Sequence, residues 1–174
     1  MTRSTVDARV DRALLKFRAA FEEAFNAHRM AEAEALLVAA EEQVNILAPR
    51  IRSWLLYYRG KMNFTNLKLD QAQNNYQLLI EQSDVEPELQ VLTALNLGDA
   101  QVEASSWAAA IQSYQQALAN PKITSSQIAD AHLGIADVYN EIAINSGGWL
   151  IPKVEKNAFL LVLRLFFEWF LRLL

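Results

Sequence analysis

The chain has 174 residues, enough for one domain with a hydrophobic core and too few to expect two. Its formal net charge is -4, and acidic and basic residues both recur along the sequence, which gives no long-range field for attracting nucleic acid. The chain has no cysteine, which excludes disulfides, thiolate metal sites and a thiol nucleophile. It also suits a reducing compartment, and the spaced charges of the first residues do not fit a cleaved signal peptide. We therefore expect a cytoplasmic protein.

Turn-forming segments divide the chain into about eight predicted helices. Ser4 and Asp7 have the spacing of a capping box, and apolar residues then recur at helical intervals. The expected helices cover residues 5–27, 31–47, 50–63, 69–82, 87–103, 106–119, 125–144 and 153–174. Alternating strand patterns are too short to predict a sheet, so the expected fold class is all-α.

Successive pairs of predicted helices share an internal repeat in their second members. Three small or large apolar residues recur with the same spacing, and the copies follow one another at nearly equal intervals: Ala33, Leu37 and Ala40; Ala72, Tyr76 and Leu79; Ala110, Tyr114 and Ala117. Gly60 and Gly98 precede the second and third copies by the same distance in sequence, and Gly134 follows Gly98 at a similar interval. A small residue on each helix of a hairpin lets the two axes approach closely, and a large residue one turn on fills the next gap.

This arrangement resembles the tetratricopeptide repeat (TPR) family of helical hairpins, whose period is about 34 residues. The resemblance is carried by "LNLGDAQ" and "WAAAIQSYQQALANP", with weaker copies in "YYRGKMNF", "AQNNYQLL" and "HLGIADVY". It implies an α-solenoid of antiparallel helical hairpins. The chain would then divide into a divergent N-terminal hairpin, TPR-like repeats, a loop and an apolar C-terminal helix, at residues 1–48, 49–144, 145–152 and 153–174.

The resemblance also implies a binding surface, because the first helices of such repeats form a concave face that receives an extended peptide or a partner's helix. The corresponding positions here give a mostly apolar groove: Trp54, Tyr57, Lys61, Phe64, Leu92, Leu95, Asp99, Val102, Ile128, Ile135, Val138 and Tyr139. Some family members hold a C-terminal carboxylate in a Lys/Asn/Arg clamp on this face. Only Lys61 could take part in one, so recognition of a free carboxylate is not expected.

The aromatic residues at the start of the first clear repeat allow two interpretations. Trp54, Tyr57 and Tyr58 could pack against the preceding hairpin, or they could be exposed anchors for a partner. Three arginines flank them, which is a pattern also found where bases of single-stranded nucleic acid stack: Arg50, Arg52 and Arg59. The acidic chain has no wider basic surface, so a nucleic-acid partner is not expected.

The sequence shows no constellation for catalysis or for a cofactor. Its two histidines are His28, in a predicted turn, and His132, on a predicted helix with acidic neighbours. Neither forms a Glu-x-x-His or His-Glu-x-x-His pattern, so the simplest interpretation of His132 is a helix-surface residue. Gly147 and Gly148 lack the Lys-Ser/Thr that completes a phosphate-binding loop. We expect no metal, no cofactor and no enzyme activity.

The last predicted helix is the most apolar, since only Arg164, Glu168 and Arg172 interrupt an apolar run that begins at Ala158. From Phe159 to Leu174 the run reaches only about 24 Å as a helix, and it contains these three charges, so a simple membrane span is disfavoured. The spacing of Ala158, Val162 and Leu165 matches that of the earlier second helices. We expect a last repeat helix whose other side is a second interface: Phe159, Leu163, Phe166, Phe167, Trp169, Phe170 and Leu174.

Together these features predict a non-catalytic protein-protein interaction module, an adaptor or assembly scaffold that binds a partner peptide or helix. Two alternatives stay open for the C-terminal helix: it joins copies of the chain into a homo-oligomer, or it lies on or in a bilayer and makes the protein membrane-peripheral. The sequence has no polar tail after this helix, a feature that a fragment of a longer protein would also show.

Overall fold

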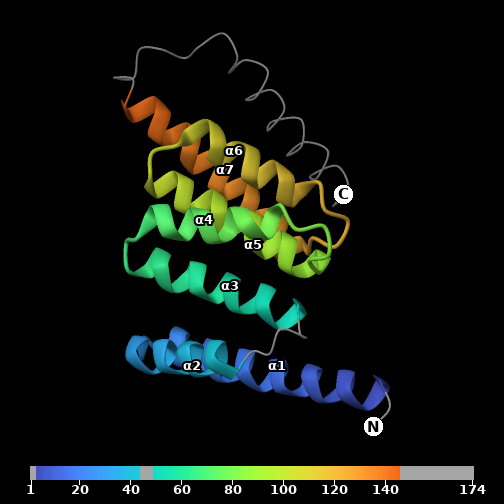
Figure 1. Cartoon of the computed structure of the whole chain (residues 1–174). Helices are drawn as coiled ribbons and strands as arrows, with labels where there is room; N and C mark the ends of the chain where they lie inside the picture. The colour runs from blue at the N-terminus through green and yellow to red at the C-terminus, as the bar shows by residue number, and fades with distance from the viewer. Residues whose placement is uncertain (1–2, 44–48, 146–174) are drawn as a thin grey trace, which may run out of the picture. The chain divides into compact units, whose positions relative to one another are not determined.

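The computed structural model describes residues 3–43 and 49–145, which form seven α-helices and no strand in these ranges (Figure 1). The helices are α1 (Arg3–Asn26), α2 (Met30–Gln43), α3 (Pro49–Thr65), α4 (Leu69–Ile80), α5 (Pro87–Glu103), α6 (Trp107–Leu118) and α7 (Ser125–Asn145). This confirms the all-α prediction, and the predicted ends that fall on described residues lie close to the observed ones, whereas the predicted end of the second helix at residue 47 lies outside them. The expected eighth helix, over residues 153–174, lies outside the described residues.

Three helix pairs, α1–α2, α3–α4 and α5–α6, close with the same short turn. The central residue of each turn has a positive φ: 57° at His28, 58° at Leu67 and 57° at Ser105. The next N–H donates to a carbonyl further back in the first helix, at distances of 2.7 to 2.8 Å, in the geometry of a Schellman motif. These turns recur at the same intervals as the sequence repeat, which is therefore a repeat of helical hairpins.

Glycine and tyrosine set the close approach of the helices within two of these hairpins. A Cβ added at Gly98 would lie 2.5 Å from the ring of Tyr114, and one added at Gly60 would overlap the ring of Tyr76 in the same way. Both tyrosines are buried, and the ring of each fills the space that the absent side chain of its glycine leaves open. The predicted role of these small residues is therefore confirmed.

Gly134 of α7 lies against a side chain of the preceding hairpin, because the ring of Tyr114 occupies the space where a Cβ of Gly134 would lie. The predicted packing of the C-terminal helix on the helix that carries Gly134 involves residues that lie outside the described ranges. Tyr114 thus lies against both Gly98 and Gly134 and links α6 to two neighbouring helices.

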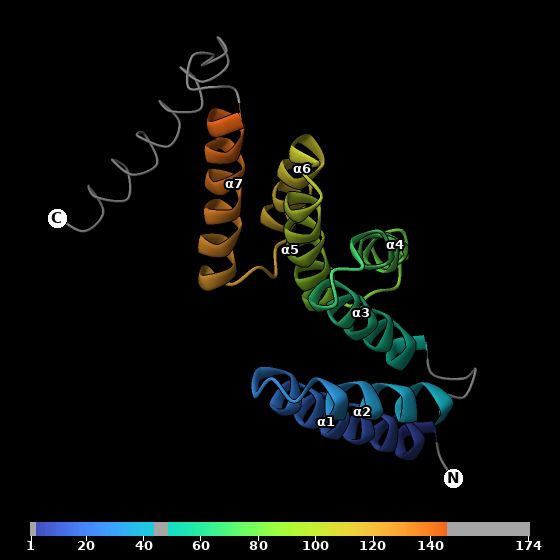
Figure 2. The same cartoon turned by 90° about the vertical axis from the view of Figure 1, so that its left-hand side faces the viewer.

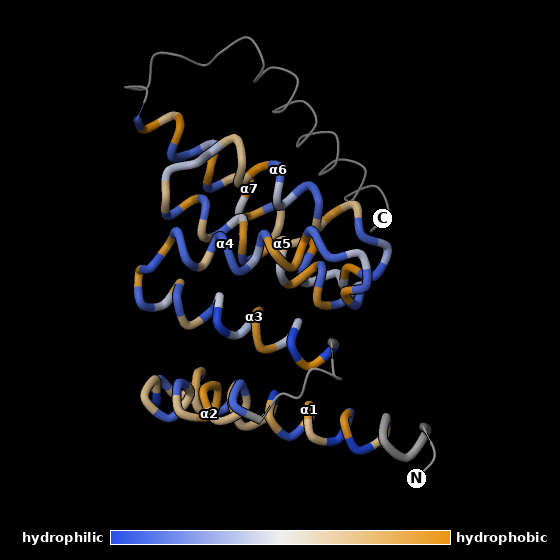
Figure 3. Tube along the Cα trace, in the orientation of Figure 1, coloured by the Kyte–Doolittle hydropathy of each residue, from blue (hydrophilic) through white to orange (hydrophobic). Residues whose placement is uncertain are grey.

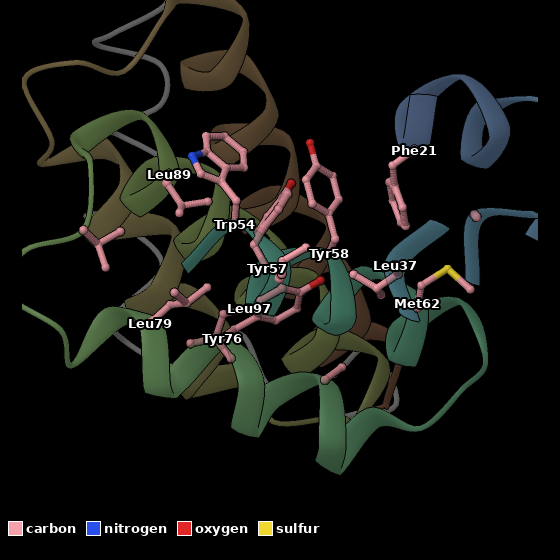
Figure 4. Close-up of a cluster of buried hydrophobic side chains, with 14 of the residues drawn as sticks. Phe21, Leu37, Trp54, Tyr57, Tyr58, Met62, Tyr76, Leu79, Leu89 and Leu97 are labelled. Atoms are coloured by element: carbon pink, nitrogen blue, oxygen red, sulfur yellow. The ribbon is translucent and has the colours of Figure 1, made fainter. Parts of the chain in front are cut away.

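An aromatic cluster joins the first two hairpins (Figure 4). The ring of Tyr58 lies 4.4 Å from that of Phe21 and 5.5 Å from that of Phe17, between centroids. Trp54 and Tyr57 extend the cluster along α3, and all the labelled members in Figure 4 are buried. Such ring pairs contribute about 0.5–1.5 kcal/mol each beyond the apolar area that they bury. Side chains of the first helices therefore connect one hairpin to the next.

The chain divides into two compact units, Met1–Ile135 and Ala136–Leu174, with the boundary inside α7. Within the first unit, α2 contacts α3, and α5 contacts both α3 and α4; Figure 2 shows the paired helices from the side. Only residues 136–145 of the second unit are described, as the C-terminal part of α7.

Apolar and polar positions are interspersed along each described helix (Figure 3). None of the described helices combines the length and the apolar character that crossing a bilayer requires.

Candidate functional site

The structure places two of the predicted groove residues, Trp54 and Tyr57, in the core. They are 1% and 4% exposed, and they hold α3 to its neighbours. The guanidinium of Arg18 lies 3.6 Å from the centre of the Trp54 ring, and Trp54 Nε1 donates to Glu86 at 3.1 Å. Asn96 Nδ2 donates to the Tyr57 hydroxyl at 3.3 Å. Packing against the preceding hairpin is thus the correct interpretation, and these two rings offer almost no surface to a ligand.

Leu95 and Val138 are buried as well, at 8% and 0% exposure, so they do not line an open surface either. Phe64 is half-buried against the core cluster. Lys61 Nζ lies 3.1 Å from a carboxylate oxygen of Glu22 and 4.5 Å from the centre of the Phe25 ring. The one cation expected on the concave face is therefore held by an acidic residue of the same chain.

Other cations of the N-terminal hairpins also form ion pairs within the chain. These pairs are Arg18 with Glu88, Arg29 with Glu23 and Glu32, Arg50 with Asp11 and Glu86, and Arg59 with Glu34 and Glu41. The hydrogen bond to Glu41 is the main cause that raises the pKa of Arg59 above its ordinary value. Internal packing thus accounts for Trp54, Tyr57 and Tyr58, and ion pairs account for Arg50 and Arg59, which had suggested stacking on nucleic acid.

A different surface lies on α5, where Leu92, Asn96, Asp99, Val102 and Glu103 form a stripe along one side of the helix. We call this set the α5 stripe. Asp99 and Glu103 are exposed, whereas the other three side chains are half-buried. The residues follow at intervals of four, three, three and one, which keeps them on one face of a helix. Three of the predicted groove residues, Leu92, Asp99 and Val102, are thus brought together here.

The N-terminal half of α7 adds further open surface from the first unit. Ile128 is 38% exposed, Asp130 is exposed, and Ile135 is half-buried. Tyr139, the last predicted groove residue, belongs to the second unit, where it is 36% exposed. The predicted C-terminal interface, Phe159 to Leu174, lies outside the described residues.

The carboxylate of Asp99 is the chemical centre of the α5 stripe. The hydroxyl of Tyr114 donates to Asp99 Oδ1 at 2.7 Å. Although Asp99 has exposed surface, its partial burial raises the pKa of its carboxyl; the hydrogen bond from Tyr114 opposes this effect, and the charges of Asp130 and Glu103 add to it. Among the described residues, no ion pair joins Asp99, Glu103 or Asp130 to a cation.

A charge count by segment agrees with the absence of ion pairs at these acids within the described residues, and the sequence interpretation missed it. Residues 69–145 carry ten acidic residues and one basic residue, Lys122, for a formal charge of -9. Residues 1–68 carry eleven basic and eight acidic residues, for a formal charge of +3. The expectation that both signs are spread along the chain is therefore wrong. Counting charge for each predicted repeat would have found this asymmetry.

The described residues offer no group of three or more His, Asp or Glu that could hold a metal ion. His28 lies in the first hairpin turn, and His132 is exposed on α7, as expected for a helix-surface residue. A shallow pocket of about 310 Å³ is lined by side chains that do not ionise: Ile80, Gln90, Gln116, Ala119, Asn120 and Pro121. This pocket has no acid or base with which to perform chemistry.

No protein-family model, curated protein or solved structure matches the chain. Its resemblance to the TPR family rests on the repeated sequence motifs, and the described hairpins add the turn geometry that repeats with them.

Proposed function

We propose that the chain is a TPR-like helical-repeat module that binds a protein partner and performs no chemistry of its own. Each first helix would contribute to one continuous face of an α-solenoid. The observation that carries this proposal is the set of three alike hairpin turns, at His28, Leu67 and Ser105, with buried side chains that connect each hairpin to the next. Repeats of this kind act by presenting an extended surface that is formed before the partner arrives.

The open part of that face is the α5 stripe with Ile128. The N-terminal part is closed by ion pairs and by buried rings, so we place the contact with the partner on α5 and on the first half of α7. This is a smaller and more acidic surface than the groove expected from the sequence. We therefore propose an adaptor or scaffold that recognises a short element of its partner.

Affinity capture with the full chain tests this function. A variant with Asn96→Arg and Val102→Arg places two bulky cations on the α5 stripe, and the matched control Leu78→Arg with Gln115→Arg places the same charges on exposed positions of α4 and α6. We expect the stripe variant to lose a partner that the wild type and the control both retain. Equal capture by all three proteins would contradict the proposed function.

The second contact surface that we propose is the C-terminal segment, and its support is composition alone, because only three charged residues interrupt the apolar run from Ala158 to Leu174. Flotation with liposomes separates the alternatives. A full chain that floats, while a chain ending at Gly148 does not, would favour the membrane-peripheral alternative. A full chain that does not float but forms a dimer, while the shorter chain is a monomer, would favour a protein interface.

A further inference from the structure

The α5 stripe combines partly open apolar surface with acidic groups along the length of one helix. Leu92 and Val102 are half-buried, so part of each side chain remains accessible, and Asp99 and Glu103 are exposed on the same side. From Leu92 to Val102 the stripe extends about 15 Å, at the usual rise of an α-helix. A surface of this kind suits a helix laid alongside it, with apolar anchors at successive turns.

The charge of this surface is unusual within the same protein. Lys61 and Asp99 occupy the same position in successive hairpins, because each directly follows the glycine of its repeat. Lys61 is paired with Glu22, whereas Asp99 has Glu103 and Asp130 as its charged neighbours. Like charges gathered near a surface repel each other, and an opposite charge brought by a ligand removes that repulsion. The N-terminal hairpins thus contain their own cations, and the α5 stripe lacks one.

We propose that the α5 stripe, together with Asp130, binds a basic amphipathic helix of a partner protein, with the partner's apolar side chains against Leu92 and Val102 and its Lys or Arg residues beside Asp99, Glu103 and Asp130. This inference rests on the proposed function and specifies the chemistry of the partner. Segment 69–145, with its formal charge of -9, would repel nucleic acid and anionic lipid, and the same stripe on a second copy would bring acids against acids.

Three synthetic peptides, each long enough for roughly five helical turns, test the proposal with the full chain. The first places leucine on one face and lysine on the other, the second replaces each lysine by glutamate, and the third scrambles the order of the first. We expect the Leu/Lys helix to bind at least about tenfold more tightly than either of the others, by fluorescence anisotropy. Its binding should weaken as salt rises, because the acids lie at the surface.

Matched variants locate the binding. The triple variant Asp99→Asn, Glu103→Gln and Asp130→Asn should weaken binding of the Leu/Lys helix by about tenfold or more. The control Asp70→Asn, Glu81→Gln and Asp84→Asn removes three acids from the same acidic segment and should change binding less than about twofold. Equal losses in both variants would mean attraction to net charge only, and would overturn the proposal.

The apolar contacts have their own pair of variants. Val102→Ser on α5 should weaken binding of the Leu/Lys helix by several-fold, whereas Leu133→Ser, at a position of α7 that is 63% exposed, should have no effect. Circular dichroism of every variant checks that the fold is retained. Equal binding of the scrambled peptide would overturn the amphipathic requirement.

Two further outcomes separate this inference from the proposed function. If the Leu/Glu helix binds as tightly as the Leu/Lys helix and both are lost in the Asn96→Arg and Val102→Arg variant, the surface is a binding site but its preference for cations is wrong. If light scattering shows a dimer that the triple acid variant disrupts, the stripe faces a second copy and the proposal is overturned. Binding of none of the peptides also overturns it, while affinity capture independently decides the proposed function.

Discussion

The faces formed by the first helices differ between the N-terminal hairpins and the α5–α7 region. On α1 and α3 the aromatic and charged side chains contact one another. Trp54 packs against Arg18, Tyr58 packs against Phe21, and Lys61 forms an ion pair with Glu22. On α5, Asp99 accepts a hydrogen bond from Tyr114 and has acidic residues as its charged neighbours. The difference teaches that equivalent positions of one repeat can be paired within the chain in one hairpin and left open in another, which is where we propose the binding surface.

Removing a ring from the centre of the N-terminal aromatic cluster should lower the free energy of unfolding more than any other change considered. Phe21 is 0% exposed, and its ring lies 4.4 Å from Tyr58 and 5.6 Å from Phe25. We expect Phe21→Ala to lower the free energy of unfolding by about 3–5 kcal/mol, because a large cavity would remain between α1 and α3. Urea unfolding followed by circular dichroism measures this change.

The matched control is Leu15→Ala on the same helix, where the side chain is 62% exposed. A change below about 0.5 kcal/mol is expected there. If Phe21→Ala costs no more than the control, the aromatic cluster does not hold the first two hairpins together.

Enlarging a glycine tests whether α5 and α6 are packed as tightly as the N-terminal cluster. A Cβ at Gly98 would overlap the Tyr114 ring, and overpacking costs about 1–3 kcal/mol, against which the better helix propensity of alanine offsets up to about 1 kcal/mol. We expect Gly98→Ala to lower the free energy of unfolding by about 1–2 kcal/mol. Adding Tyr114→Leu should remove the overlap, so the double variant should lose less than the sum of the two single losses. Strict additivity in thermal or urea unfolding would refute this contact.

The two buried tyrosines, Tyr76 and Tyr114, differ in whether their hydroxyl group has a hydrogen-bond partner. Tyr114 donates to Asp99 at 2.7 Å, whereas the hydroxyl of Tyr76 is buried without a hydrogen-bond partner in the described structure. The residue after Gly98 is an acceptor, Asp99, while the residue after Gly60 is Lys61, which pairs with Glu22. The two tyrosines therefore occupy equivalent positions with opposite consequences for their hydroxyl groups.

Replacing each tyrosine by phenylalanine measures that difference. We expect Tyr114→Phe to lower the free energy of unfolding by about 1 kcal/mol, through loss of the hydrogen bond. Tyr76→Phe should leave it unchanged or raise it by up to about 1 kcal/mol, because an unpaired buried polar group disappears. A larger loss for Tyr76→Phe than for Tyr114→Phe in parallel urea titrations would contradict the assigned contacts.

The sequence predicted the helices and the hairpins well because their signals are local. Pro87 starts α5, and the glycine–tyrosine spacing places Gly60 beside Tyr76. What it could not predict depends on contacts between hairpins. A tryptophan at position 54 looks the same in the sequence whether its side chain is buried or exposed. The packing of α1 against α3, with Arg18 over the Trp54 ring, is what buries it. The contact of Tyr114 with Gly134 of the next helix is a further contact between hairpins that the repeat spacing alone does not give.

The difference in charge between residues 1–68 and residues 69–145 could have been predicted from the sequence by counting acidic and basic residues in each segment. Its structural meaning required the positions of individual groups, because the ten acids of residues 69–145 do not all lie on one surface. Glu86 and Glu88 pair with Arg50 and Arg18, whereas Asp99 forms no ion pair within the described chain.

The smallest expected effects compare two acids at the same repeat position, Glu22 and Asp99. Glu22→Gln should lower the free energy of unfolding by about 0.5–1 kcal/mol, because it breaks the pair with the half-buried Lys61. Asp99→Asn should instead raise it by about 0.5 kcal/mol or less at neutral pH, since it removes the desolvation cost of a partly buried carboxylate and, to a smaller extent, its repulsion from Asp130 and Glu103, which solvent screens in part. Urea titrations at neutral pH measure both changes.

The pH dependence of the Asp99→Asn effect has a definite sign. A carboxyl whose pKa is raised in the folded state destabilises that state when it is ionised, and this penalty disappears as the pH falls through the raised pKa. The gain in free energy of unfolding that Asp99→Asn produces should therefore shrink as the pH falls. The same variant should bind the Leu/Lys helix more weakly. A substitution that improves stability and impairs binding is the expected behaviour of a surface maintained for a ligand. If Asp99→Asn lowers stability at neutral pH as Glu22→Gln does, Asp99 serves cohesion like its N-terminal counterpart and the contrast between the two faces fails.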